Sequence, residues 1–161
     1  MEVLKDILDV MAKLIGIPSA VLGVFTAALG VYTYFRDSKR KLCNETMAEY
    51  KRLQEEVFDK LNDWTSAEQV AEAADSPGTY GHTELDNALA RIEHFCVGLN
   101  RGVYDFETFY QLSHGYFDYK LQRLFEPLLD KKLNEYDGGE DYYNNLHKVW
   151  KRMAERSEKE L

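Results

Sequence analysis

The chain has 161 residues, enough for one domain with its own core but not comfortably for two once a membrane-sized apolar segment is set aside. It carries 20 Lys and Arg residues against 28 Asp and Glu residues, and the formal net charge of -8 argues against broad nucleic-acid binding. The two cysteines, Cys43 and Cys96, lack CxxC spacing and are expected to be small hydrophobic residues of the core.

An apolar run without formal charge covers residues 14–35, with the sequence LIGIPSAVLGVFTAALGVYTYF. At about 1.5 Å per residue, a helix of this length crosses a hydrocarbon layer of roughly 30 Å. The run therefore predicts a single transmembrane helix. Residues 1–37 are expected to form the first domain, which consists of an amphipathic segment followed by the span.

Small and hydroxylated side chains recur along this run at intervals of seven residues and share one helical face. The face comprises Gly16, Ser19, Ala20, Gly23, Thr26, Ala27, Gly30 and Thr33. A heptad period in a membrane helix favours left-handed packing, and the glycines allow close approach of a partner backbone. Because one span is visible, the partners are expected to be other copies of the chain. We call this face the seam.

The seam continues as a polar stripe toward the N-terminus, where it carries Glu2, Asp6 and Asp9. A stripe that changes from charged to hydroxylated as it enters the apolar run is typical of a helix that lines a water path with a charged vestibule. One hypothesis is therefore a homo-oligomeric pore of three or more chains, whose acidic rings favour cations. The alternative, tight packing without a channel, uses the same small residues.

Pro18 leaves the geometry of the first residues open. A kink at this proline would place residues 1–13 on the membrane surface as an amphipathic segment. A continuous helix is the alternative, because neighbouring helices can satisfy a freed carbonyl group.

Basic residues crowd the C-terminal end of the span, namely Arg36, Lys39, Arg40 and Lys41. The N-terminal segment carries fewer basic residues and three acidic ones, so the positive-inside rule places the C-terminal part in the cytoplasm. The sequence thus predicts a single-pass membrane protein with a cytoplasmic C-terminal domain. The basic cluster is also expected to contact anionic lipid headgroups.

Residues 38–161 are expected to form one cytoplasmic, all-α, helical-bundle domain. Helical periodicity covers residues 38–64, and neither Gly nor Pro separates this stretch from the span. Residues 65–82 form the main connecting loop, with room for a short helix over residues 67–74.

Capping residues indicate where the next helices begin and end. Thr83 indicates the N-cap of a helix that Gly102 ends, and Asp105 can cap the helix that follows. The later elements are a short helix over residues 106–115, a longer one over 115–136 interrupted by Pro127, and a last helix over 141–158. Most of the aromatic residues in this half are expected in the core; the others are expected to line a ligand pocket or a subunit interface.

The sequence contains no motif that points to catalysis. No two histidines are spaced i, i+4, and the patterns HExxH, GxxxxGK[ST], GxGxxG and GxSxG are absent. Cys96 follows His94 by two residues, a separation that points their side chains to different faces of a helix. We therefore expect a protein that is not an enzyme, with no catalytic residue, metal or cofactor.

A pattern of the form E-x-F/I-x-x-G-x-x-x-G-x-x-D/E is supplied by Glu93, Phe95, Gly98, Gly102 and Asp105. With the aromatic helix after it, this stretch resembles a family of bacterial single-span membrane proteins that is known only as a domain of unknown function. The resemblance implies an anchor in the bacterial inner membrane that is joined to a helical domain. The layout also looks like that of membrane effectors in anti-phage defence systems, which assemble as oligomers and depolarise the cell.

Two functional hypotheses follow. In the first, the seam forms an ion pathway that the helical domain holds shut until a regulatory ligand or protein partner acts. In the second, the chain is a membrane-tethered adaptor that dimerises through its span and recruits a cytoplasmic partner.

Overall fold

The computed structural model describes residues 2–135 and 143–160, except for the side chains of residues 2–4, 7–9, 11–20, 114, 118 and 129–135. Every regular element in this described part is helical, which confirms the all-α prediction. The chain divides into two compact units, Met1–Lys41 and Leu42–Leu161.

The first unit consists of residues of helix α1, whose bounds are Glu2–Leu53. Pro18 lies inside this helix, in agreement with the continuous alternative rather than the kinked one. Across the residues that the structure describes, we find no helix with the length and apolar character that a membrane crossing needs. The side chains of residues 11–20, which belong largely to the predicted span, lie outside the described residues.

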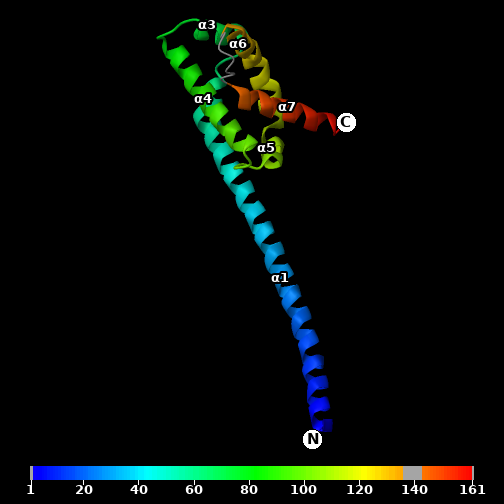
Figure 1. Ribbon diagram of the computed structural model, residues 1–161. Helices are drawn as coiled ribbons and strands as arrows, with labels where there is room; N and C mark the ends of the chain where they lie inside the picture. The colour runs from blue at the N-terminus through cyan, green and yellow to red at the C-terminus, as the bar shows by residue number, and fades with distance from the viewer. Residues whose placement is uncertain (1, 136–142, 161) are drawn as a thin grey trace. The chain divides into compact units, whose positions relative to one another are not determined.

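The second unit begins with the last turns of α1 and continues into a π-helical segment, η1 (Gln54–Phe58), and a short helix, α2 (Asp59–Leu61). A connecting segment leads to α3 (Ala67–Ala74) and then to α4 (Tyr80–Asn100) (Figure 1). The predicted short helix over residues 67–74 is therefore confirmed.

The predicted N-cap at Thr83 is wrong, because the N-cap of α4 lies four residues earlier, at Thr79. Gly78 adopts a φ of +83°, and the backbone of Thr79 is extended. The Thr79 hydroxyl accepts a hydrogen bond from the backbone N–H of His82 at 3.2 Å, which satisfies one of the first donors of the helix. Thr83 is already helical, and its hydroxyl donates to the carbonyl oxygen of Thr79 at 3.2 Å.

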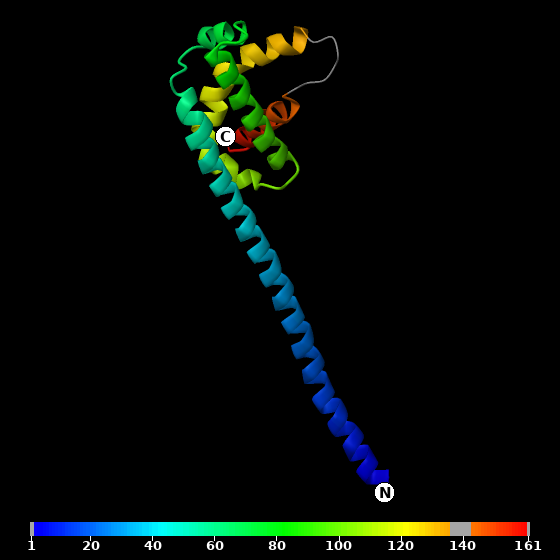
Figure 2. The same cartoon turned by 90° about the vertical axis from the view of Figure 1, so that its left-hand side faces the viewer.

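The C-terminal half contains α5 (Phe106–Ser113), a second π-helical segment η2 (His114–Leu121), α6 (Gln122–Glu135) and α7 (Asn144–Glu158). Pro127 lies inside α6, so the predicted interruption at this proline is wrong. The chain departs from α-helical geometry earlier, over η2. Helix α4 packs against α7, and α3 packs against both α4 and α6 (Figures 1 and 2).

The core of this unit is rich in aromatic rings, as predicted. Phe95, Phe109, Tyr110, Phe117, Phe125 and Trp150 are buried, and Tyr104, Phe106, Tyr116 and Tyr143 pack against them while partly exposed. Tyr119 is the clear departure, since 73% of its surface is exposed. Tyr142 lies outside the described residues.

The two π-helical segments contact each other through aromatic rings. The rings of Phe58 in η1 and Tyr116 in η2 are 4.9 Å apart, and the Tyr116 hydroxyl donates to the carbonyl oxygen of Phe58 at 3.2 Å. Burial raises the pKa of Tyr116 to about 12, so the hydroxyl keeps its proton near neutral pH. π-Helical segments interrupt the regular hydrogen-bond ladder and often mark functional positions.

Candidate functional site

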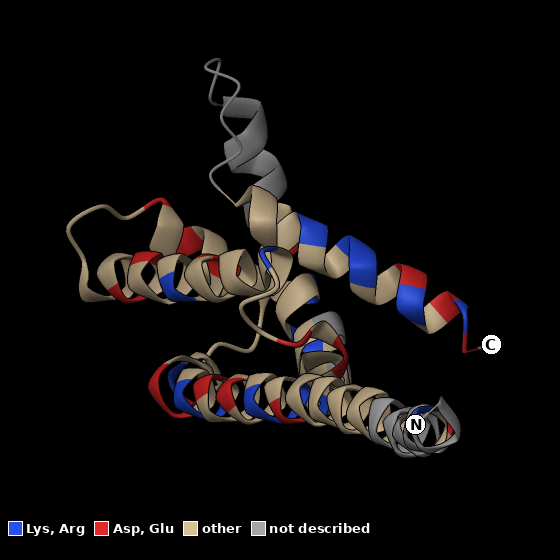
Figure 3. Ribbon diagram, turned by 60° about the horizontal axis from the view of Figure 1, so that its bottom comes forward, with Lys and Arg blue, Asp and Glu red and all other residues tan. Residues whose placement is uncertain are grey.

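The described part of α1 exposes a long apolar surface. Between residues 21 and 35 its large apolar side chains are all more than half exposed: Val21, Leu22, Val24, Phe25, Leu29, Val31, Tyr32, Tyr34 and Phe35. Figure 3 shows the same stretch without charge, in contrast to the mixed charges along the helices of the second unit. A continuous apolar surface of this kind marks contact with a membrane or with other chains.

The described residues of the seam are Gly23, Thr26, Ala27, Gly30 and Thr33, and all of them are exposed. A methyl group added at Gly23 or Gly30 would meet no atom within 4 Å. No described neighbour in this chain therefore requires glycine at either position, and both positions are open to close approach by another helix. Gly16, Ser19 and Ala20 lie outside the residues whose side chains are described.

The threonine hydroxyls of the seam are hydrogen-bonded to their own helix. The Thr26 hydroxyl donates to the carbonyl oxygen of Leu22, and the Thr33 hydroxyl donates to that of Leu29, both at 2.8 Å. Each hydroxyl oxygen can still accept a further hydrogen bond. The two residues thus tolerate an apolar environment and also offer acceptors to water or to a cation.

The charged residues predicted to flank the span are exposed where they are described. This holds for Asp6 at the predicted vestibule and for Arg36, Lys39, Arg40 and Lys41. Arg36 forms an exposed ion pair with Asp37 at 3.7 Å, a contact that contributes little to stability. Glu2 and Asp9 lie outside the residues whose side chains are described.

Three residues of the E-x-F-x-x-G pattern shape the end of α4. The Gly98 carbonyl oxygen accepts hydrogen bonds from the backbone N–H groups of Val103 at 2.9 Å and Tyr104 at 3.3 Å. Gly102 adopts a φ of +72°, a left-handed conformation that glycine adopts without strain. Phe95 is buried and stacks on Tyr104, with ring centroids 5.1 Å apart. The predicted stop at Gly102 is confirmed.

Asp105 caps α5, as predicted. Its carboxylate accepts hydrogen bonds from the backbone N–H of Thr108 at 2.8 Å and from the Thr108 hydroxyl at 2.7 Å. The backbone N–H of Asp105 donates to the hydroxyl oxygen of Thr46 at 2.7 Å, and Thr46 is fully buried on α1. The Cys43 thiol lies 3.9 Å from the Asp105 carboxylate. This contact joins residues 43–46 of α1 to the start of α5.

Glu93 caps the last helix. Its carboxylate accepts hydrogen bonds from the backbone N–H groups of Asn145 at 3.1 Å and Leu146 at 2.9 Å, and from the Asn145 side-chain amide at 2.8 Å. These N–H groups belong to the first turn of α7, where an anion is favourable. Arg152 of α7 in turn donates to the carbonyl oxygen of Leu99 near the end of α4 at 3.4 Å.

The pattern therefore has a structural role in this chain. Its residues hold α4, α5, α7 and the end of α1 together in what we call the α4 junction, which comprises Thr46, Glu93, Phe95, Gly98, Gly102, Tyr104, Asp105 and Asn145. Sequence reasoning missed Thr46 and Asn145, since neither forms part of a local motif.

Replacing Glu93 with glutamine is expected to destabilise the helical domain by about 1–3 kcal/mol, because the new amide N–H₂ cannot accept the hydrogen bonds of the α7 N-terminus. Urea unfolding followed by circular dichroism measures the change. Glu155→Gln on the exposed face of α7 is the matched control and should change the unfolding free energy little. Equal stability of the Glu93→Gln variant and the wild type would contradict the capping role.

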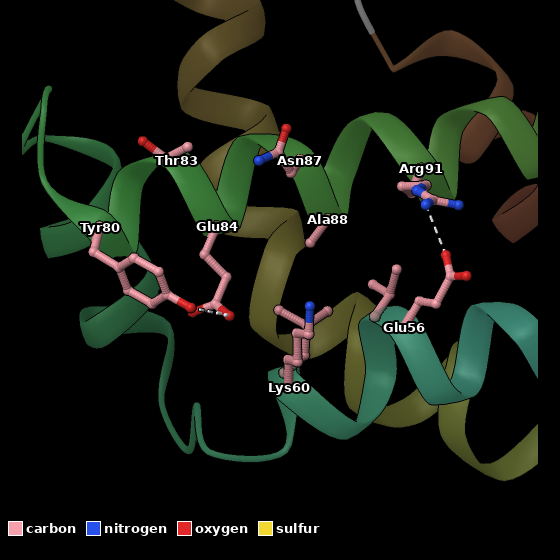
Figure 4. Close-up of a pocket in the computed structure, with 10 residues that line it drawn as sticks. Glu56, Lys60, Tyr80, Thr83, Glu84, Asn87, Ala88 and Arg91 are labelled. Carbon is pink, nitrogen blue, oxygen red and sulfur yellow. Dashed lines mark hydrogen bonds and ion pairs between the residues drawn. The ribbon is translucent and has the colours of Figure 1, made fainter.

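A groove of about 470 Å³ lies between η1–α2 and α4 (Figure 4). Arg91 reaches across it to Glu56 at 2.7 Å, and at the other end the Tyr80 hydroxyl lies 3.4 Å from the Glu84 carboxylate. The amino group of Lys60 points into the space between them (Figure 4). The carboxylates of Glu56 and Glu84 balance the charges of Lys60 and Arg91. The lining of this groove therefore favours neither an anionic nor a cationic ligand.

The described residues offer little for covalent or metal chemistry. No group of three or more His, Cys, Asp or Glu side chains among them is arranged to hold a metal ion. Cys96 is fully buried, as predicted, and burial raises the pKa of its thiol well above the usual value. Cys43 is only partly buried, which differs from the prediction of a core residue.

Comparisons of this chain with protein-family models, with curated protein sequences and with solved structures gave no match. The resemblance to a family of single-span membrane proteins stays a prediction from the sequence pattern.

Proposed function

We propose that the chain is a membrane effector that self-associates through residues 14–35 and forms an ion pathway whose opening the helical domain controls. The observation that supports this most is the exposed apolar surface of α1 from Val21 to Phe35. Leaving so many large apolar side chains in water is unfavourable by roughly 25 cal/mol per Å² of apolar surface. A bilayer removes this cost, and the flanking Arg36–Lys41 cluster suits its cytoplasmic face.

The seam supports the proposed self-association. Gly23 and Gly30 leave room for a neighbouring backbone, and no described contact within the chain uses that room. Between them, Thr26 presents a hydroxyl that keeps one acceptor position after bonding Leu22. In a ring of three or more chains, such positions would line a common axis.

Control by the helical domain is supported by the one residue of α1 that belongs to the α4 junction. Thr46 belongs to α1 and accepts the Asp105 backbone N–H, so a rearrangement at the start of α5 acts directly on this helix. The stretch from 31 to 53 contains neither Gly nor Pro. In a bacterial inner membrane the open path would dissipate the membrane potential, which is how an effector in anti-phage defence would act.

The second candidate is the membrane-tethered adaptor. One observation favours it: the hydroxyls of Thr26 and Thr33 are hydrogen-bonded to their own helix and need no water. A dimer whose helices pack along the seam without water between them is equally compatible with these hydrogen bonds. Its helical domain would recruit a cytoplasmic partner. The adaptor conducts no ions under any stimulus, which separates it from the pore.

Self-association is tested by the mass of the protein in detergent, measured by light scattering. The wild type is expected to contain three or more copies. Gly23→Leu together with Gly30→Leu is expected to lower the copy number, because leucine fills the space that a partner backbone needs. Val24→Leu, outside the seam, is the control and should keep the wild-type mass. A monomeric wild type, or a double variant with unchanged mass, would refute assembly through the seam.

A further inference from the structure

A second groove lies between the segment that precedes α3 and the turn where η2 passes into α6. Its volume is about 570 Å³, which falls in the range of small-molecule sites, roughly 300–1,000 Å³. Residues 64–68 line one side, and Tyr119, Lys120, Arg123 and Leu124 line the other. Helices α3 and α6 pack against each other and hold the two sides in place.

The groove carries two cations that form no ion pair with any residue whose side chain the structure describes. The Lys120 amino group donates to the Asn62 side-chain oxygen at 2.6 Å and lies 5.3 Å from the centre of the Tyr116 ring, and both partners are neutral. Arg123 is exposed, and within the described residues neither cation forms a salt bridge. A lysine and an arginine that line the same groove without a carboxylate partner attract an anion locally.

The same groove carries two aromatic side chains. Tyr119 is 73% exposed, so its ring contributes little to the core, and Trp64 is only partly buried. An exposed ring offers a face on which a planar group can stack. The groove of Figure 4 also has an exposed tyrosine, Tyr80, but its hydroxyl lies 3.4 Å from the Glu84 carboxylate, and Arg91 in that groove is paired with Glu56.

We propose that this groove binds a nucleoside phosphate, with its base on Tyr119 and Trp64 and its phosphate on Lys120 and Arg123. Arginine and lysine are the side chains that proteins use for phosphate, the first through its planar fork and the second as a compact charge. Binding itself does not depend on the membrane. The further step, that the nucleotide is the regulatory ligand of the ion pathway, rests on the proposed function.

Glu68 is the carboxylate among the described lining residues. Its removal should strengthen nucleotide binding, whereas removal of the cations or of the tyrosine should weaken it. Hydrogen bonds from its own backbone N–H and from the Ser66 side chain lower the pKa of Glu68, so it stays ionised near neutral pH. A negative charge at this position repels a phosphate. Glu68→Gln is therefore expected to tighten nucleotide binding severalfold.

The experiment is a calorimetric titration of the full-length chain in detergent with ATP, adenosine and inorganic triphosphate. ATP is expected to bind more tightly than either fragment, because it uses both the aromatic and the cationic parts of the groove. Tyr119→Ser and Arg123→Gln are each expected to weaken ATP binding about tenfold or more. Tyr80→Ser, an equally exposed tyrosine in the groove of Figure 4, and Lys151→Gln on α7 are matched controls.

Three results would overturn the proposal: no binding of ATP, triphosphate binding as tight as that of ATP with no effect of Tyr119→Ser, or a loss of binding in Tyr80→Ser instead of Tyr119→Ser. The calorimetric titration measures nucleotide binding without recording any current. Its result is therefore independent of whether the chain forms an ion pathway. A chain that binds ATP but never conducts ions would support the nucleotide site and contradict the ion pathway.

Discussion

Replacing Gly98 with alanine is expected to destabilise the helical domain by about 1–3 kcal/mol, the range for overpacked sites. The added methyl group would lie 2.4 Å from two carbon atoms of the Tyr104 ring, closer than atoms can approach. The ring cannot easily move away, since it stacks on the buried Phe95 at 5.1 Å. Thermal or urea unfolding of the two proteins measures the difference.

The matched control is Gly81→Ala in the same helix, α4. A methyl group there would meet the Ala73 side chain at 3.6 Å, an ordinary contact. Alanine is the better helix former, so this control is expected to be neutral or slightly stabilising. Combining Gly98→Ala with Tyr104→Ala should destabilise the domain by less than the sum of the two single changes, because the truncated side chain no longer meets the new methyl group. Similar stabilities of the Gly98 and Gly81 variants would contradict the close packing of the α4 junction.

Replacing Thr26 with leucine is expected to abolish ionic current through the assembled protein. Thr26 lies on the seam between Gly23 and Gly30, and its hydroxyl oxygen keeps an acceptor for water or a cation after bonding Leu22 at 2.8 Å. Leucine removes that acceptor and adds apolar bulk, and an apolar constriction closes a pore by expelling water. Planar bilayer recordings of the purified variant measure the effect.

Phe25→Leu is the control for this substitution, because it places the same side chain on the neighbouring position, outside the seam. It is expected to leave the conductance close to that of the wild type. The mass of both variants in detergent must match that of the wild type, so that a lost current reports the pathway rather than the assembly. An unchanged current in Thr26→Leu would rule out the seam as the lining.

Local patterns in the sequence predicted much of the fold. Apolar periodicity without strand-like alternation indicated helices throughout, and the short helix α3 and the cap at Asp105 were found from single residues and their spacing. Gly102 was identified as a helix stop, which agrees with its φ of +72°. These features depend on a few residues that are neighbours in the sequence, so they can be predicted without knowledge of the tertiary structure.

The misses have physical causes. Thr79 and Thr83 are both plausible caps, and the turn at Gly78 decides for the earlier one. The π-helical segments η1 and η2 differ from an α-helix by one residue per turn over a short stretch, a difference too small for apolar periodicity to reveal. Pro127 was expected to interrupt its helix and instead lies inside α6.

The candidate sites also differ in whether the sequence alone can predict them. The seam could be found from the sequence because its residues recur along one helix. Thr46 and Glu93 meet residues of other elements, Asp105 and Asn145, only through the tertiary packing of the domain. The groove with Tyr119 depends on the packing of α3 against α6, which no pattern within either segment specifies.

The most direct test of the ion pathway is a planar bilayer recording of the full-length protein, made together with a measurement of its mass in detergent. A variant limited to residues 1–41 is recorded alongside, because it would reveal a pathway that the helical domain keeps closed. We expect stepwise currents from an assembly of three or more chains. These currents should occur in the full-length protein or, where the helical domain holds the pathway shut, in the shortened variant. A silent dimer, with a shortened variant that is equally silent, would contradict the ion pathway and leave the membrane-tethered adaptor.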